Sequence, residues 1–339
     1  MSGAAPRAGV YALELVGESD DLPALEAESA ATGVAVVAPG LATAGSVALE
    51  RVRGLAYVRA ASELVARTDA DVDAAVAALA AAPLDREGTV AVRARDVRGS
   101  ADVDTQRAEG ALGAVLVERG FDVDLEAPDH ELRALFAAPA RDDDAGVCLL
   151  GWTAAESVRD FAERAPTDRP FFQPGSMEPM LARALVNVAG ARPDRTVLDP
   201  MCGTGGVLLE AGLVGARVLG VDAQRKMVRG TRRNLADGLD GDWDVVRGDA
   251  TRLPLADAAV DAAVFDVPYE RQSTVAGTSL EALVTGALAE VRRVAPRAVV
   301  VADRDWSAAA RDAGWTVAAR VERRVHRSLV RHCHVLDAR

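Results

Sequence analysis

From Arg195 to the C-terminus, short apolar runs alternate with helix-forming stretches, and this alternation restricts the possible folds more than any other feature of the chain. Parallel strands need long crossover connections, usually helices, so the pattern predicts an α/β fold class with a doubly wound, mostly parallel sheet. Ligands of such sheets bind beyond the carboxyl ends of the strands. The expected strands are Thr196–Asp199, Arg217–Asp222, Asp244–Arg247, Val260–Phe265 and Ala298–Ala302, and two closing strands, Thr316–Arg324 and Leu329–Leu336, predict an antiparallel edge.

The front half of the chain follows an α+β pattern instead. Four prolines and Gly175 between residues 163 and 180 predict a stiff linker between the two halves. Alternation and helical spacing give the expected elements of the front half. These are strands at Tyr11–Val16, Val34–Val37, Ala56–Arg59, Thr89–Arg95, Leu132–Phe136 and Val147–Trp152, and helices at Leu22–Thr32, Asp69–Ala82 and Thr105–Arg119.

Charge and hydropathy exclude several classes of protein. Asp and Glu number 51 against 39 Lys and Arg, which gives a net charge of −12, and Lys226 is the single lysine. This balance suggests a halophilic host, where surface carboxylates keep a protein hydrated; full activity and stability at low salt would count against that hypothesis. No apolar run approaches the roughly 20 residues of a membrane span, and no secretory signal pattern is present. We therefore expect a soluble, cytoplasmic, globular protein, and we also expect a monomer.

Cysteine and histidine give no signal for a metal site. Cys148, Cys202 and Cys333 are too few and too scattered for a disulfide framework or a thiolate zinc site. His332 and His334 share one face of an expected edge strand, with Cys333 between them. A zinc site needs four ligands, and no fourth candidate is near these three residues in the sequence. No metal is expected.

A glycine-rich turn follows the first strand of the back half. It reads Asp199-Pro-Met-Cys-Gly-Thr-Gly-Gly206, and its glycines allow a sharp turn and close approach to a ligand ahead of a helix N-terminus. A dinucleotide site needs G-x-G-x-x-G, whereas Leu208 occupies the third glycine position, so a pyrophosphate cradle is disfavoured. The expected cofactor-binding residues of the turn are Cys202, Gly203, Thr204, Gly205 and Gly206, with Cys202 a small packed residue without a catalytic role.

Three carboxylates follow three successive strands. Asp222 is placed to accept hydrogen bonds from ribose hydroxyls, Asp249, beside Ala250, from an adenine amino group, and Asp199 to hold a cationic amino-acid portion. A ligand with a ribose, an adenine and a positive charge is S-adenosylmethionine. The sequence therefore predicts this cofactor.

The fourth strand ends in Asp266-Val267-Pro268-Tyr269. The pattern D/N-P-P-Y at this position is typical of methyltransferases that act on exocyclic base amines. Such an amine is a weak nucleophile, so the Asp266 carboxylate and the Val267 carbonyl are expected to accept its N–H groups and hold its lone pair towards the methyl group, while the base stacks on Tyr269. Val267 replaces the usual proline, which keeps the carbonyl but removes the stiffness of the ring.

The chain resembles the archaeal tRNA (guanine-10-N2)-dimethyltransferases. Residues 169–189 resemble the segment before the catalytic core of that family, the motifs at 199–206, 266–269 and 324–329 continue the match, and residues 89–136 resemble a THUMP domain. The resemblance implies a ferredoxin-like segment at 1–50, a THUMP RNA-binding domain at 51–155, a linker at 156–180 and a Rossmann-like class I methyltransferase domain at 181–339. It also implies methylation of N2 of guanine 10 in tRNA, with tRNA as the partner and neither DNA nor membrane.

Alternatives remain open at this point. The same motif serves methylation of N6 of adenine and of guanine N2 at other RNA sites, and a non-catalytic tRNA-binding protein is the third reading, with Val267 as its only support. An acidic chain is an unusual RNA ligand, although Arg93, Arg95 and Arg98 give the front half a local basic strip. Phe171 and Phe172 either wall the substrate pocket or pack in the core.

Overall fold

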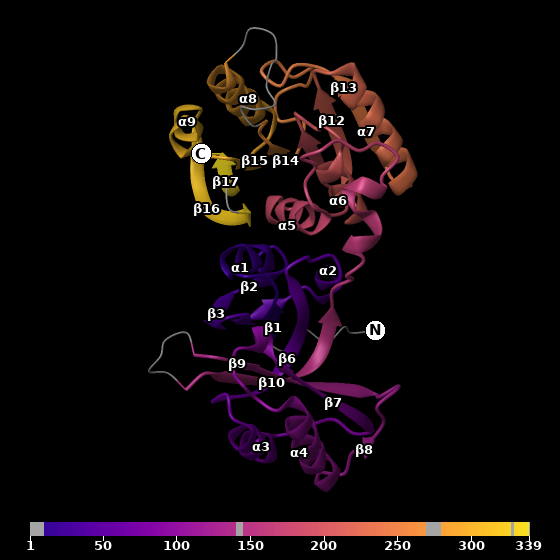
Figure 1. Ribbon diagram of the computed structural model, residues 1–339, viewed down its shortest axis with the longest axis vertical. Coiled ribbons are helices and arrows are strands. Elements are labelled where there is room, and N and C mark those ends of the chain that lie inside the picture. Colours follow the sequence, from indigo (N-terminus) through magenta and orange to yellow (C-terminus); the bar gives the residue numbers. More distant parts are fainter. Residues whose placement is uncertain (1–9, 140–144, 269–278, 327–328, 339) are drawn as a thin grey trace, which may run out of the picture. The chain divides into compact units, whose positions relative to one another are not determined.

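The computed structural model describes residues 10–139, 145–268, 279–326 and 329–338. The chain divides into two compact units, Met1–Val158 and Arg159–Arg339, and each is described by itself (Figure 1). None of the helices in the described ranges is long and apolar enough to cross a membrane.

One mixed sheet of eight strands runs through the first unit, in the order β3-β4-β1-β6-β10-β9-β7-β8. Strands from both the predicted segment 1–50 and the predicted segment 51–155 belong to it. The pairs of β7 with β8 and β9 are parallel and the others are antiparallel. The strands are β1 (Tyr11–Leu15), β3 (Ala35–Ala38), β4 (Leu41–Ala44), β6 (Val58–Thr68), β7 (Thr89–Asp96), β8 (Asp122–Val123), β9 (His130–Ala137) and β10 (Val147–Glu156), and β2 (Ala31–Thr32) pairs separately with β5 (Ser46–Val47).

Helices α3 (Val72–Ala81) and α4 (Thr105–Glu118) cover one face of this sheet, and α1 (Asp21–Ala27) and α2 (Leu49–Val52) complete the unit. The side chains of Asp71 and Asp104 accept backbone N–H groups at the N-termini of α3 and α4, as N-cap residues do. Two predicted lengths are wrong. Helix α1 ends at Ala27 because residues 31–32 pair with β5, and β6 extends to Thr68 because β1 and β10 flank it.

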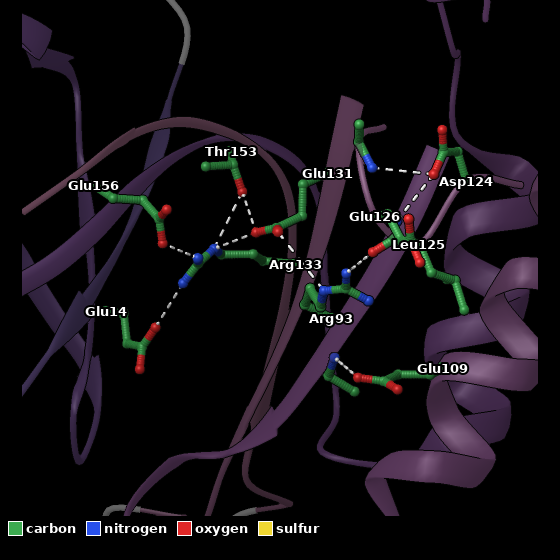
Figure 2. A network of polar contacts seen from close by, with 12 residues as sticks. Glu14, Arg93, Glu109, Asp124, Leu125, Glu126, Glu131, Arg133, Thr153 and Glu156 are labelled. Atoms are coloured by element: carbon green, nitrogen blue, oxygen red, sulfur yellow. Dashed lines mark hydrogen bonds and ion pairs between the residues drawn. The ribbon is translucent and has the colours of Figure 1, made fainter. Parts of the chain in front are cut away.

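A network of charges around two buried side chains connects strands β1, β9 and β10 of the first unit (Figure 2). Arg133 on β9 is 7% exposed and Glu14 on β1 is 2% exposed. The guanidinium of Arg133 donates to Glu14 Oε2 at 3.1 Å, to Glu131 Oε1 at 3.1 Å and to Glu156 on β10. Each buried charge in this network therefore has an opposite charge within hydrogen-bonding range, as burial requires.

The second unit contains a seven-stranded sheet in the order β13-β12-β11-β14-β15-β17-β16. The five strands from β13 to β15 are parallel, whereas β17 runs antiparallel to both β15 and β16, so the doubly wound sheet and its antiparallel edge are confirmed. The strands are β11 (Thr196–Asp199), β12 (Arg217–Asp222), β13 (Trp243–Arg247), β14 (Ala262–Asp266), β15 (Arg297–Ala302), β16 (Trp315–His326) and β17 (Leu329–Ala338). The helices are α5 (Pro179–Ala189), α6 (Gly206–Leu213), α7 (Arg225–Gly238), α8 (Leu280–Val294) and α9 (Ser307–Asp312).

The proline-rich segment and helix α5 belong to the second unit. Arg164 donates to the fully buried Glu210 on α6 at 2.8 and 3.2 Å. Helix α5, which the sequence pattern did not indicate, starts at Pro179 and ends at Ala189. Gly190 follows as the C-cap, and its φ of +92° is the left-handed conformation that suits this position. Residues 159–180 are thus packed on the back-half fold.

Candidate active site

A cavity of about 700 Å³ opens at the carboxyl ends of β11, β12 and β14. This is the edge where a doubly wound sheet binds its ligands. Eleven of the residues predicted from sequence line the cavity: Asp199, Cys202, Gly203, Thr204, Gly206, Asp222, Asp249, Ala250, Asp266, Val267 and Pro268. Gly205 is not among the lining residues, and Tyr269 lies outside the described residues.

The glycine turn has a backbone that side chains rarely permit. Gly203 and Gly205 have φ values of +53° and +80°. A Cβ on Gly205 would lie 2.6 Å from the Cγ2 atom of Thr231 on α7. The hydroxyl of Thr231 donates to the Gly203 carbonyl at 2.7 Å, so α7 holds the turn against the start of α6. Gly205 therefore shapes the site without lining it.

Two carboxylates below the turn are difficult to ionise. Asp199 is 3% exposed, and burial, followed by the charges of Asp222 and Asp266, raises its pKa well above 3.8 against the opposing effect of one N–H from Met201. Burial also raises the pKa of Asp222, whose two oxygens accept the backbone N–H groups of Gly203 at 3.0 Å and Gln224 at 2.8 Å. Each oxygen retains a second lone pair for a ligand. A cation bound beside Asp199 and Asp222 would stabilise the ionised form of both side chains.

The remaining predicted residues of the cofactor end also have defined surroundings. Cys202 lies 3.2 Å, at its sulfur, from where a Cβ on Gly220 would be, and burial raises the pKa of its thiol, so it is a packed, unreactive side chain. Thr251 donates through its backbone N–H and its hydroxyl to Oδ1 of Asp249, which fixes the orientation of that carboxylate.

A segment that the sequence pattern assigned to the linker forms one wall of the cavity. Gln173, Ser176 and Met177 line it, and the Ser176 hydroxyl lies 3.0 Å from the Thr204 hydroxyl. Asn234 on α7 holds this segment, because its side chain accepts from Phe171 N and donates to Phe171 O and Thr204 O, each at 2.8 Å. The missed signal was a pair of polar residues, Thr231 and Asn234, three positions apart on the buried face of an amphipathic helix.

The motif at the end of β14 lies at the other side of the cavity. Val267 is 2% exposed and its N–H donates to the Val301 carbonyl at 2.8 Å, which continues the pairing of β14 with β15. This hydrogen bond and the burial of the side chain fix the backbone at Val267, the position where the usual motif has a proline ring. Asp266 lies within 3.6 Å of the Arg331 guanidinium.

The aromatic and histidine candidates lie away from the cavity. The ring of Phe171 packs on α7 at Gly230, where a Cβ would be only 2.0 Å from it, and Phe172 is 39% exposed. Neither is among the residues that line the cavity. His334 Nε2 accepts the Trp306 N–H at 3.1 Å, and His332 lies 3.5 Å from Glu322, so both imidazoles have protein partners.

The donor set of the cavity fits S-adenosylmethionine. Asp199, Asp222, Asp249 and Asp266 line it, and none of the lining residues within the described ranges is Arg, Lys or His. The four carboxylates would repel a pyrophosphate, whereas a ligand with an ammonium and a sulfonium group neutralises them. The bound cofactor would supply an electrophilic methyl group; Asp199 would hold its cationic portion and Asp222 its ribose.

The fold and this site define a class I methyltransferase that uses S-adenosylmethionine. A family model described as "RMKL-like, methyltransferase domain" matches residues 166–332. The chain is 38% identical over 292 residues to a tRNA (guanine(10)-N2)-dimethyltransferase of Methanothermobacter thermautotrophicus, which covers 84% of this chain and 83% of the relative. It belongs to the tRNA (guanine(10)-N2)-dimethyltransferase family.

Two further comparisons concern the family and the fold. The enzyme of the same name from Pyrococcus abyssi is 32% identical over 258 residues, 75% of each chain. Among solved structures, TrmN from Thermus thermophilus matches with a TM-score of 0.51 and 23% identity over 97% of this chain and 100% of its own, which shows a shared fold.

Proposed function

We propose that this protein transfers methyl groups from S-adenosylmethionine to N2 of guanine 10 in tRNA, to give N2-methyl- and N2,N2-dimethylguanosine. The observation that carries the proposal is the position of Asp266, Val267 and Pro268 at the rim of a carboxylate-lined cavity, in a chain that belongs to this enzyme family. The motif and the predicted cofactor site open into the same cavity, as in-line methyl transfer requires.

The chemistry follows from the acceptors at the end of β14. The Asp266 carboxylate and the Val267 carbonyl accept the two N–H groups of the guanine amine and turn its lone pair to the methyl group. The amine gains positive charge during transfer, and the Asp266 carboxylate stabilises that charge. The carboxylate oxygen that accepts the N–H group is also our candidate to receive the departing proton. Tyr269 is our candidate for the stacking face of the base, which must leave its helical stack at a cost of a few kcal/mol.

For the first unit we propose the role of a THUMP RNA-binding domain that places the tRNA, in a monomeric enzyme of the cytoplasm. Its basic strip is less positive than the sequence suggests. Arg93 lies 3.8 Å from Glu131, Arg95 lies 3.0 Å from Glu14, and Arg98 lies 2.5 Å from Asp20. With these charges compensated, we expect shape and stacking to carry more of the tRNA affinity than phosphate contacts, and a shallow dependence of affinity on salt.

One assay tests the proposal. The protein is incubated with labelled S-adenosylmethionine and unmodified tRNA transcripts, and the tRNA is then digested to nucleosides. We expect N2-methyl- and N2,N2-dimethylguanosine, and no label in a transcript with adenosine at position 10. N6-methyladenosine would select the adenine reading, and tRNA binding without methylation would select the non-catalytic one.

The variant Asp266→Ala sharpens this assay. We expect methyl transfer to fall by at least about 1,000-fold, because one carboxylate orients the amine and stabilises its charge. Calorimetric binding of S-adenosylhomocysteine should remain, since the glycine turn and Asp222 are intact. An active variant removes Asp266 from the mechanism.

A further inference from the structure

Arg331 is a buried arginine that lies outside the motifs quoted above for the proposed reaction. It lies on β17, is 6% exposed, and its Nη2 atom is 3.6 Å from Oδ2 of Asp266. A buried guanidinium is costly unless it is paired, so its placement beside a carboxylate is a specific feature of the fold.

The strand register explains how two residues 65 positions apart meet. Asp266 is aligned with Val301 on β15, and Val301 is aligned with Cys333 on β17. Arg331 precedes Cys333 by two residues, and residues two apart on a strand point to the same face. The side chains of Arg331 and Asp266 therefore leave the same face of the sheet. Its side chain must cross the intervening strand β15 to reach Asp266, a span that suits the length of arginine.

The charges around Asp266 show what this cation does. Asp199 on β11 repels Asp266, as does the thiol of Cys333 on β17 if it ionises, and Asp222 adds negative charge from β12. The aligned residue on the neighbouring strand β15, Val301, is apolar. No cation lines the cavity within the described residues, and Arg331, which is near Asp266, is not among the lining residues.

We infer that Arg331 is a positioning residue for the proposed methyl transfer: it holds one oxygen of Asp266 so that the carboxylate stays ionised and presents its other oxygen to the guanine amine. The inference rests on the proposed function. It assigns different roles to two carboxylates of the cavity. Asp266 has a cation of the protein beside it and acts on the substrate, whereas Asp199 obtains its cation only when the cofactor binds.

The test compares Arg331→Met and Arg331→Lys with the unaltered protein in the nucleoside assay. For Arg331→Met we expect kcat to fall on the order of 100-fold, as when a buried charge loses its partner. The KM for tRNA and the affinity for S-adenosylhomocysteine should stay unchanged. The acidic limb of the kcat profile should move to higher pH, because a carboxylate that loses a neighbouring cation protonates at higher pH. Arg331→Lys should recover part of kcat and of the profile, since it keeps the charge and loses the planar fork.

A matched control is Arg195→Met. Arg195 also pairs with an aspartate, Asp261, at 2.5 Å, but at the amino end of the sheet, and it does not line the cavity. We expect its kcat to lie within about twofold of the unaltered protein, because half-exposed ion pairs contribute little.

The possible outcomes distinguish a positioning role from a structural one. Unchanged kcat and pH profile in Arg331→Met overturn the inference, and so does equal loss of cofactor binding and transfer in both Arg331 variants, which marks a purely structural role. If Arg331→Met does not fold, the pH profile of Arg331→Lys decides. If the unaltered protein makes no N2-methylguanosine, the proposed function fails instead.

Discussion

Two buried carboxylates, one in each unit, have opposite electrostatic surroundings. Glu14 in the first unit is 2% exposed and lies within 3.9 and 3.0 Å of Arg59 and Arg95. It also lies 3.1 Å from Arg133 (Figure 2). Asp199 in the second unit is 3% exposed and faces further carboxylates across the cavity. A buried charge with protein partners needs no ligand, whereas a buried charge without them is tolerated where a ligand of opposite sign completes it. The difference therefore separates a structural network from a binding site.

Glu14→Gln should produce the largest loss of stability. It leaves Arg133 buried with one acceptor fewer and removes the carboxylate that three arginines share, which costs about 3–5 kcal/mol of unfolding free energy for a broken buried pair. Urea unfolding of the full-length protein measures this cost. Affinity for S-adenosylhomocysteine should be unaffected, and a change below about 1 kcal/mol would show that the network is not structural.

Asp199→Asn is the matched change in the second unit and should act in the opposite direction. The amide keeps an acceptor for the Met201 N–H and removes the repulsion, so the ligand-free protein should gain about 1 kcal/mol of stability. Affinity for S-adenosylmethionine should drop about 10–100-fold, because the cationic portion of the cofactor loses its counter-charge. Calorimetry and urea unfolding separate the two effects, and destabilisation of the ligand-free variant would contradict the comparison.

The pH dependence of stability sharpens the same point. The pKa of Asp199 is raised in the fold, so its contribution to stability is fully present below pH 3.8, its usual value, and is lost as pH rises through the folded pKa. The stability advantage of Asp199→Asn should grow over that window and then level off. Binding of S-adenosylmethionine near the folded pKa should release a proton, which calorimetry in buffers of different ionisation enthalpy detects; binding without proton release would exclude Asp199 as the counter-charge.

Val267→Pro should have the smallest effect. The proline restores the residue usual in the motif but removes the N–H that donates to Val301. We expect a loss of about 1 kcal/mol in stability and little change in kcat, because the carbonyl at this position is retained. A large gain in kcat would contradict this expectation. It would show that the stiffness of a proline at this position matters more for the reaction than the β14–β15 hydrogen bond that the variant removes.

Motifs whose parts are close in sequence lie together in the structure. The glycine turn except Gly205, the aspartates that end β11 and β12, and the segment 266–268 line the cavity, because parallel strands bring their carboxyl ends to one edge. Helix α5 and the segment around Ser176 were missed. Four prolines masked them, and Asn234, which holds that segment, is more than fifty residues away.

The sequence by itself determined the α/β class of the back half, the order of its strands along the chain and the side chains at each strand end, because periodicity and turn chemistry are local properties. Only the tertiary structure decided which charges are compensated. It paired Arg93, Arg95 and Arg98 with carboxylates and brought Arg331 across a strand to Asp266. It left Asp199 without a cation among the described residues that line its cavity. Coulomb interaction and desolvation depend on distance and burial in space, which the order of residues does not contain.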